Sequence, residues 1–513
     1  RWSESEQKFI GWERKRGKLE ELNRLIDGTR PEDANRLVYV GDPDHLHDVR
    51  FIITLDSDTQ LPHDTARRMI ETLAHPLNQP RFDANGTIEA GSYAIIQPRV
   101  SPSLPSTNAS LFSRLFSDPV GIDPYTKAVS DVNHDLAGEG SYHGKGIYDV
   151  RAFSRVLSGT FPEECLLSHD LIEGAHVRVG LASDIELYDE FPQDYMSYTG
   201  RQHRWIRGDW QIAEWVLPRV PQPAGRRGRN PLSRFDRWKI FDNLRRSLVP
   251  AASLGLLVAS WPISPRMGLI STCVVAAQFL FHPLAQPFTW ATTGQWMKGF
   301  SSSKVTHDLL RSIVEAALLP HQAWLALDAI VRTWYRRLIS HRRLLEWTSA
   351  QVMHWNAPGK VRTFVMTLGL SSIFSGMAAW AVQRWAPSSL PVASPWLALW
   401  FVSPLAGWLL ANRPAARPRK IHIPEKDLRF LRCVARRTWS YFSEFVGEET
   451  SWLPPDNYQV SHTNQLSMRT SPTNIGFWML STLGAHDFGY MTVDQVVEAL
   501  TRTTETIGKL ERY

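Results

Sequence analysis

The sequence predicts an α/β domain built on a parallel sheet, then a group of membrane-spanning helices, then a smaller all-α domain. Residues 51–54 (Phe-Ile-Ile-Thr) are apolar or β-branched without alternation, which is typical of a strand buried on both faces of a parallel sheet. Apolar stretches near the length of a membrane span lie between residues 236 and 412, and amphipathic helical patterns return in residues 421–513. At 513 residues the chain is long enough for two or three domains.

Composition narrows the class of protein. A net charge of +6 suits a nucleic-acid binder, a membrane protein with basic inner loops, or an enzyme that handles phosphorylated donors. The three cysteines, Cys165, Cys273 and Cys433, are too far apart for a disulfide framework or a metal motif, which favours a reducing compartment. Twenty-one tryptophans are typical of membrane interfaces and carbohydrate sites. Because the chain opens at Arg1 without a signal peptide and stops at Tyr513 without a closing signature, we expect a piece of a longer protein.

Residues 11–18 form a basic segment ahead of a predicted helix that carries Leu19, Leu22 and Leu25 on one face. Lys18 lies near the start of this helix, where the helix dipole and unpaired N–H groups favour a phosphate. A solvated basic turn explains the same residues. Both interpretations are open at this point.

Two carboxylates, Asp56 and Asp58, follow the strand at residues 51–54. Ligands of open α/β sheets lie at the carboxyl ends of strands. Carboxylates spaced i, i+2 at that place can share one Mg²⁺ or Mn²⁺, and the ion can neutralise a diphosphate. We therefore predict a metal and nucleotide-sugar site here, the alternative being an acidic turn without a ligand.

A glycine-rich segment at residues 138–146 carries His143 and Lys145. Its four glycines let the backbone approach a ligand closely, and the two side chains add polar reach. The segment lacks the Gly-Lys-Ser/Thr ending of a Walker loop, which disfavours a nucleoside triphosphatase.

Two further polar motifs follow. Asp170 stands where a helix is predicted to begin, so its carboxylate is either a helix N-cap or a general base beside an acceptor hydroxyl. Residues 201–210 contain three arginines and two tryptophans; arginine can clamp a diphosphate, and tryptophan can stack on a sugar. An RNA-binding patch and a juxtamembrane anchor are the alternatives for this motif.

Four segments are candidates for membrane spans, because each with its flanks approaches the roughly 17–20 residues that a span needs. They are residues 248–261, 267–281, 364–382 and 392–411. Basic residues concentrate before, between and after the two pairs, so by the positive-inside rule the soluble parts face the cytoplasm. Residues 309–338, in a longer stretch at 300–345, are amphipathic and interrupted by Pro320; we expect them to lie in the membrane interface.

Residues 421–513 predict a soluble helical domain. We expect helices at 428–445 and 493–513, a proline-rich aromatic loop at 450–458, and a further helix that opens at Ser471.

Together these motifs resemble known enzymes. Asp56-Ser57-Asp58, then Asp170, then Arg204-Trp205 ahead of membrane spans resembles the processive family-2-like glycosyltransferases, of which cellulose synthase is the familiar case. The closer resemblance is to the cyclic β-1,2-glucan synthases, over their glycosyltransferase family 84 region and the start of their glucoamylase-like domain. The motifs that carry it are residues 11–18, 138–150, 167–174, 204–211 and 473–476.

The resemblance implies a fold, an activity and a place in the cell. Residues 1–235 would be a GT-A-like glycosyltransferase domain whose first strands precede Arg1, residues 236–412 a membrane region, and residues 421–513 the start of an α/α toroid. The activity would be inverting transfer of glucose from UDP-glucose into β-1,2-glucan at the bacterial inner (cytoplasmic) membrane. The partners would be UDP-glucose, a growing glucan either free or attached to the protein itself, and the bilayer, but no nucleic acid.

The resemblance also implies roles for single residues. Asp56 and Asp58 would hold Mg²⁺ or Mn²⁺ and UDP, and Asp170 would deprotonate the acceptor hydroxyl. The side chains near the donor would be Lys18 and Arg204, and those near the acceptor and product would be His143, Lys145, Arg201 and Trp205. The chain departs from the related synthases at Arg201, where they often carry Gln.

Two other readings are open. The chain could be another processive β-glucan synthase of the cellulose-synthase type, because motifs do not determine the linkage. It could also be a non-catalytic membrane protein that binds or exports carbohydrate, although the presence of Asp56, Asp58 and Asp170 argues against this. A nucleic-acid binder explains the charge, but arginines beside membrane spans fit membrane topology better.

Overall fold

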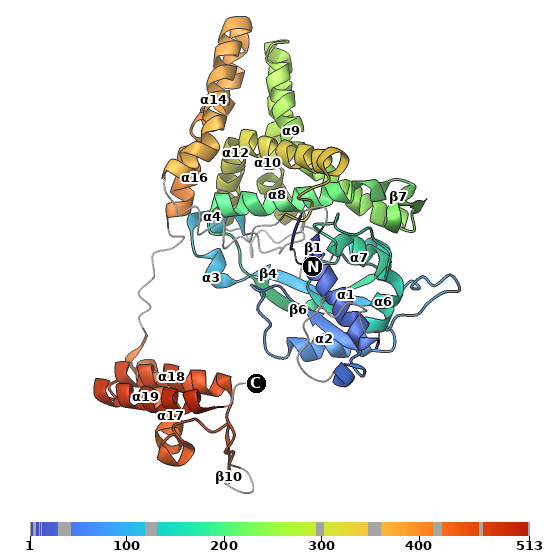
Figure 1. The fold of residues 1–513 in the computed structure, drawn as a ribbon. Helices are drawn as coiled ribbons and strands as arrows, with labels where there is room; N and C mark the ends of the chain where they lie inside the picture. Colours follow the sequence, from blue (N-terminus) through green and yellow to red (C-terminus); the bar gives the residue numbers. More distant parts are fainter. Residues whose placement is uncertain are drawn as a thin grey trace. The chain divides into compact units, whose positions relative to one another are not determined.

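The computed structural model describes residues 2–3, 7–9, 11, 13–28, 43–117, 131–293, 302–346, 361–413, 423–460 and 465–510. It is mostly helical and divides into two compact units, residues 1–417 and 418–513. The larger unit contains a mixed sheet and a group of long helices, and the smaller one is helical with a short hairpin (Figure 1).

The central sheet has four strands in the order β3-β5-β4-β6. They are β3 (Phe51–Thr54), β4 (Ile95–Pro102), β5 (Gly146–Asp149) and β6 (Val179–Asp189). Strand β5 runs antiparallel to both neighbours, whereas β4 and β6 are parallel. Strands β3, β4 and β6 therefore point the same way, and their carboxyl ends share an edge with the amino end of β5.

The prediction that residues 51–54 form a buried strand of a parallel sheet is wrong in its pairing. Among the described residues, β3 pairs with β5 alone, and it does so antiparallel. Both faces of β3 are nevertheless covered, since Phe51 and Ile53 pack on one apolar cluster and Ile52 on another. An unbroken apolar run indicates that both faces of a strand are buried, but it does not determine whether the neighbouring strand is parallel or antiparallel.

Helices cover the sheet on both faces. Alternate side chains of β4 point to opposite faces: Ile95 packs with α1, α6 and α7, and Ile96 packs with α2. These helices are α1 (Arg14–Ile26), α2 (Thr65–Ala74), α6 (Val150–Leu157) and α7 (Asp170–Val177). The shorter elements of this part are β1 (Trp2–Ser3), β2 (Lys8–Phe9), α3 (Leu104–Thr107), α4 (Leu111–Phe116), α5 (Val132–Ala137), β7 (Arg219–Pro221) and β8 (Arg227–Arg229).

Long helices make up the rest of the larger unit. They are α8 (Tyr195–Gln211), α9 (Arg234–Ser260), α10 (Pro265–Thr293), α12 (Ser302–Tyr335), α14 (Val361–Trp385), α15 (Leu390–Phe401) and α16 (Ser403–Asn412). Among the described helices, α14 is long and apolar enough to cross a membrane, and α15 with α16, bent by 42°, counts as a second if taken together. A shorter apolar stretch, Pro265–Phe281, lies in α10. The count of four spans stays a prediction.

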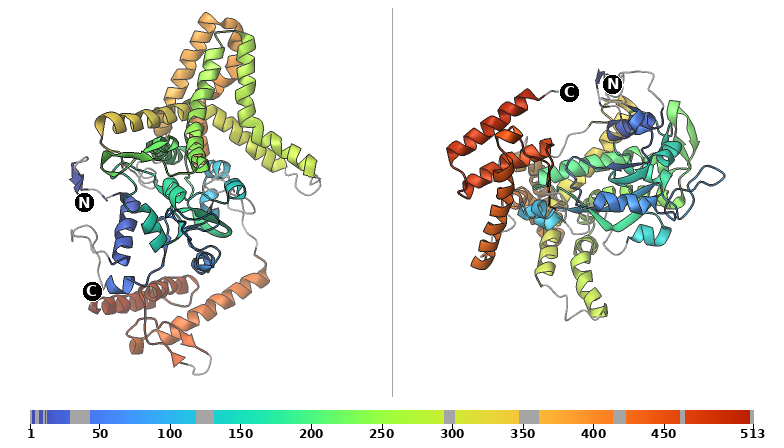
Figure 2. Two further views of the ribbon diagram at one scale, coloured as in Figure 1. Left: turned by 90° about the vertical axis from the view of Figure 1, so that its right-hand side faces the viewer. Right: turned by 90° about the horizontal axis from the view of Figure 1, so that it is seen from below.

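Helix α12 lies crosswise to α9 and α14 and connects the apolar helices to α8 (Figures 1 and 2). Toward α8, Asp328 accepts a bond from His203 at 2.9 Å, and His321 lies 3.0 Å from the Tyr195 hydroxyl. On the apolar side, the indole N–H of Trp400 donates to the Ala316 carbonyl at 3.2 Å.

The predicted interruption at Pro320 is wrong, since α12 runs unbroken from Ser302 to Tyr335 with this proline inside it. Proline lacks the N–H that would bond the carbonyl four residues earlier. That carbonyl belongs to Ala316, and Trp400 supplies the missing donor. The position of this helix at a membrane interface stays a prediction.

The smaller unit consists of α17 (Glu425–Phe445), α18 (Pro472–Asp487) and α19 (Val493–Lys509), with a hairpin of β9 (Tyr458–Gln459) and β10 (Gln465–Leu466). The helices expected in this part of the chain are present, although α19 ends at Lys509 and residues 511–513 of the predicted 493–513 lie outside the described residues. Its core is aromatic: the rings of Trp439 and Trp478 stack at 5.8 Å, and Trp478 donates to the hydroxyl of Thr503 at 2.9 Å.

Candidate functional site

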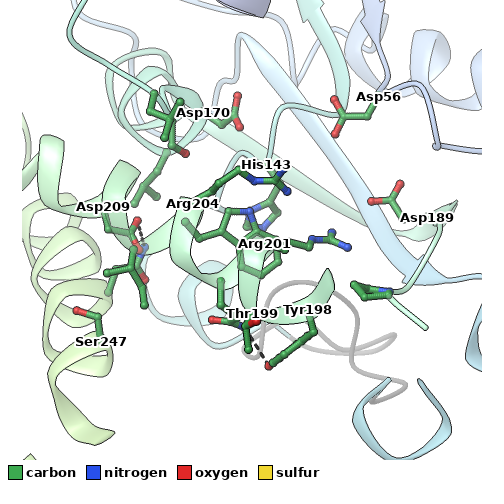
Figure 3. Close-up of a pocket in the computed structure, with 18 of the residues that line it drawn as sticks. Asp56, His143, Asp170, Asp189, Tyr198, Thr199, Arg201, Arg204, Asp209 and Ser247 are labelled. Carbon is green, nitrogen blue, oxygen red and sulfur yellow. Dashed lines mark hydrogen bonds between the residues drawn. The ribbon is translucent and has the colours of Figure 1, made fainter. Parts of the chain in front are cut away.

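A cleft of about 1680 Å³ opens at the sheet edge where β3 and β6 end and β5 begins. Its other walls come from α1, from the start of α7, from α8, and from α9, α10 and α12. The nine residues predicted from the sequence all line it: Lys18, Asp56, Asp58, His143, Lys145, Asp170, Arg201, Arg204 and Trp205. In Figure 3, Asp56 and Asp189 lie on one side of the view and Asp170 on the other, with His143, Arg201 and Arg204 drawn between them.

Four charged groups form one connected set at the sheet edge. The Lys145 ammonium lies 2.9 Å from Asp56 Oδ2 and 2.8 Å from Asp189 Oδ2. The Lys15 ammonium binds Asp56 Oδ1 at 2.7 Å and the Gly144 carbonyl at 2.6 Å. The hydroxyl of Thr59 donates to Asp189 Oδ1 at 2.7 Å. We call Lys15, Asp56, Lys145 and Asp189 the edge cluster.

These contacts shift two pKa values. Burial works against the charged form of Asp56, but Lys145 and Lys15 outweigh it and lower the Asp56 pKa. Burial likewise works against the Lys145 ammonium, and Asp56 and Asp189 outweigh it and raise the Lys145 pKa. Asp56 and Lys145 are therefore held in their ionised forms.

The edge cluster fits the predicted metal site poorly. Each oxygen of Asp56 already accepts from a lysine, so a divalent ion bound to either oxygen would lie close to an ammonium and be repelled by it. Among the described residues, the group of His, Cys, Asp and Glu whose ligand atoms lie within 4.8 Å of one another is His169, Asp170 and Glu173, which does not include Asp56 or Asp58. Metal binding by Asp56 and Asp58 stays a prediction.

Asp170 is the first residue of α7, and the N-cap position belongs to His169. The N-cap interpretation of the Asp170 carboxylate is therefore wrong, and the side chain lines the cleft. Behind it, His169 Nδ1 lies 2.8 Å from Glu173 and 3.4 Å from Asp170 Oδ1. Burial opposes the imidazolium of His169, but Glu173 and Asp170 outweigh it and raise the His169 pKa.

The Asp170 carboxylate lies close to the backbone of Gly144. Gly144 has a φ of +76°, and a Cβ at this position would lie 2.8–3.0 Å from the three carboxylate atoms of Asp170. Glycine is the residue that provides both the left-handed backbone and the missing side chain.

Arginines from two helices face the middle of the cleft. Helix α8 places Arg201 and Arg204 one turn apart, and the Arg201 guanidinium lies 4.7 Å from the centre of the Trp205 ring. Burial, then the charges of Arg201 and Arg207, lowers the pKa of Arg204 to about 10. Burial, then the charges of Arg204 and Arg207, lowers the pKa of Arg14 to about 10. An anion bound here would relieve this repulsion.

Several lining residues were not predicted from the sequence: Arg14, Lys15, Asp189 and Asp209. Lys18 does line the cleft, but Lys15, one turn earlier on α1, makes the contact with Asp56. The spacing of Lys15 and Lys18 on one helix face was a usable signal. The sequence around Asp189 gives no comparable signal, because the place of this residue depends on the register of β6 against β4.

A cleft that brings arginines and lysines together with several carboxylates, Asp170 among them, is the kind of site that enzymes use to transfer a group from a phosphorylated donor. No family model matches the chain. The chain is 36% identical, over an alignment of 525 residues that takes in 100% of it, to the cyclic beta-(1,2)-glucan synthase NdvB of Rhizobium meliloti (strain 1021). It spans 18% of the length of that relative. The predicted resemblance to the cyclic β-1,2-glucan synthases is confirmed.

Proposed function

We propose that this chain carries the transferase site of a membrane-bound, inverting glycosyltransferase that polymerises glucose from UDP-glucose into β-1,2-glucan. The 36% identity to a cyclic beta-(1,2)-glucan synthase supports a glucan-synthesising glycosyltransferase. The observation that carries the mechanism is the cleft that brings Asp56, Asp58 and Asp170 together with the arginines of α8.

The donor end of the cleft suits a nucleoside diphosphate. When the bond between the sugar and the diphosphate breaks, negative charge grows on the leaving UDP. Arg204, Arg201 and Arg14 are positioned in a partly buried cleft, where their attraction for this charge is stronger than in water. Lys18 lies in the same cleft, one turn beyond Lys15.

Asp170 is the proposed general base. Its carboxylate would accept the proton of the acceptor hydroxyl while that oxygen bonds to the anomeric carbon and UDP leaves with the electron pair of the broken bond. A single displacement inverts the anomeric centre, so an α-linked donor gives a β-linked product. The imidazole of His169 lies 3.4 Å from this carboxylate and 2.8 Å from Glu173, so its charge favours the ionised form of the proposed base.

The acceptor end lies beside α8. Trp205 is 39% exposed, and its ring, stacked by Arg201, offers an apolar face to a glucose ring. His143, next to Gly144, lines the same cleft. We assign Trp205, Arg201 and His143 to the acceptor end of the glucan.

The same proposal extends to architecture and location. The mixed sheet with helices on both faces fits a GT-A-like domain in residues 1–235, and the aromatic three-helix unit fits the start of an α/α toroid. The one or two described helices that are apolar enough to cross a membrane support a place in the membrane, and the multi-pass topology and the cytoplasmic cleft are part of the proposal.

The test uses membranes that contain the full-length protein, with radiolabelled UDP-glucose and Mg²⁺ or Mn²⁺. We expect label in β-1,2-linked glucan with the wild type, and a loss of about 100-fold or more with Asp170→Asn. Asp184→Asn, an exposed carboxylate on β6, is the matched control and should keep full activity. Glucan of another linkage would favour a different β-glucan synthase. Intact UDP-glucose binding without incorporation would favour a carbohydrate-binding or export protein.

A further inference from the structure

The side chain of Lys145 fills the space between two carboxylates at the sheet edge. It is only 6% exposed, and its ammonium contacts Asp56 and Asp189 at 2.9 and 2.8 Å. These carboxylates come from the ends of β3 and β6, whereas the lysine directly precedes β5. One ammonium therefore ties three strands together at the edge where the cleft opens.

The backbone around Lys145 is closely packed. Gly144 and Gly146 flank it with φ values of +76° and +151°, and a Cβ on Gly146 would clash with the Ile96 carbonyl oxygen. Asp189 is also held from its other oxygen by Thr59. The backbone on both sides of Lys145 is therefore closely packed, and its two ion pairs locate the ammonium.

Charge balance shows why a divalent ion does not belong in this place. The edge cluster contains two lysines and two aspartates, and its formal charge is zero. A Mg²⁺ between Asp56 and Asp189 would either meet the buried ammonium at close range or expel it from its partners. Both are costly in a partly buried site, where charges are weakly screened.

Asp58 stands in a different situation. No hydrogen bond or ion pair within the described part of the chain engages its carboxylate, which lines the cleft and lies near Arg204. The two aspartates of the Asp-x-Asp pair therefore differ. Asp56 is ion-paired with two lysines, whereas Asp58 lines the cleft and has no ion pair within the described part of the chain.

We propose that Lys145 is a positioning residue for the transfer reaction, acting as a built-in counter-ion that keeps a divalent cation out of the space between Asp56 and Asp189. Asp58 is then the carboxylate of the pair that is available to an ion carried by the donor. This rests on the proposed function for the donor, but the exclusion of the cation concerns only the residues of the edge cluster.

The first experiment measures Mn²⁺ binding to the purified full-length protein by electron paramagnetic resonance, with no nucleotide or acceptor present. Lys145→Met removes the ammonium and keeps the length of the side chain, so we expect Mn²⁺ binding roughly tenfold or more tighter than in the wild type. Lys145→Arg, which keeps the charge, should show no such gain. Adding Asp189→Asn to Lys145→Met should abolish the gain.

Two results would overturn the proposal. One is a Lys145→Met protein that is folded, as judged by its thermal midpoint, but binds Mn²⁺ no more tightly than the wild type. The other is that the wild type binds Mn²⁺ and the single variant Asp189→Asn binds it more weakly. The space between Asp56 and Asp189 would then hold an ion even with Lys145 present. Neither result depends on sugar transfer, so the proposal can fail while the proposed function stands.

A second measurement is available if Lys145→Met does not fold. Mn²⁺ binding to the wild-type chain in the presence of UDP is compared with that of Asp56→Asn and Asp58→Asn. We expect Asp58→Asn to weaken it about tenfold or more and Asp56→Asn to weaken it far less. Equal losses in both variants would refute the division of roles.

Discussion

Gly144→Ala is a sharp probe of the site, because it adds one methyl group directly against the proposed base. The new Cβ would lie 2.8 Å from Asp170 Oδ1, whereas an ordinary contact starts at 3.4 Å, so the carboxylate would have to retreat by about 0.6 Å. Displacements of about 1 Å at a reacting group can cost about 100-fold in rate. We therefore expect kcat to fall about 10- to 100-fold with little change in the KM for the donor.

The same substitution has a backbone cost that must be separated from this effect. An alanine at a φ of +76° is destabilised by about 1–2 kcal/mol. Gly138 provides the matched control: its φ is +68°, but a Cβ there meets nothing within 4 Å. Gly138→Ala should lower the thermal midpoint about as much as Gly144→Ala does and leave kcat unchanged.

The assay is initial-rate incorporation of labelled glucose by membranes with matched amounts of protein, together with thermal unfolding of the purified variants. In an Asp170→Asn background, Gly144→Ala should have little further effect, because both changes act through the same carboxylate. Equal kcat values for Gly144→Ala and Gly138→Ala would refute the assignment of Asp170. Additive losses in the double variant would refute the contact as the cause.

Three further expectations concern other parts of the chain. Burial raises the pKa of Asp209 from 3.8 to about 7, despite a hydrogen bond from Asn243. The stability that the protonated Asp209 carboxyl contributes is therefore lost as the pH rises from 3.8 to about 7. The thermal midpoint of Asp209→Asn, relative to that of the wild type, should increase over the same window. Arg204→Met should raise the KM for the donor about 10- to 100-fold, measured by initial rates at varied UDP-glucose, and an unchanged KM would remove it from the donor site. Trp478→Ala should destabilise the smaller unit by about 3–5 kcal/mol, seen as an earlier loss of near-ultraviolet circular dichroism, whereas an unchanged transition would contradict its place in the core.

The residues of the site were predictable because their signals are local. Asp56 and Asp58 follow a strand, His143 and Lys145 lie among glycines, and Asp170 starts a helix; each signal places a side chain at the end of an element. Ends of strands and helices converge at one edge of an α/β sheet, so predictions made separately came together in one cleft.

The pairing of these side chains was not predictable, because it depends on contacts between distant segments. The ion pairs of Lys145 require β3, β5 and β6 to be in one register, which no single stretch of sequence encodes. The prediction of a helix interruption at Pro320 was wrong for the same reason, namely a contact from a distant segment. The effect of Pro320 on α12 is cancelled by Trp400, which lies 80 residues further along the chain.

Helix α12 has a practical consequence for how this protein can be prepared. Leu325 and Ala326 line the cleft, while Ala316 and Leu319 of the same helix pack in the apolar core with Trp400. A shortened chain that ends near residue 235, made to obtain a soluble catalytic domain, would lack this wall and those of α9 and α10. Detergents or lipids that loosen the apolar helices would act on the cleft through the same helix, so the choice of solubilising agent becomes a variable of the enzyme assay itself.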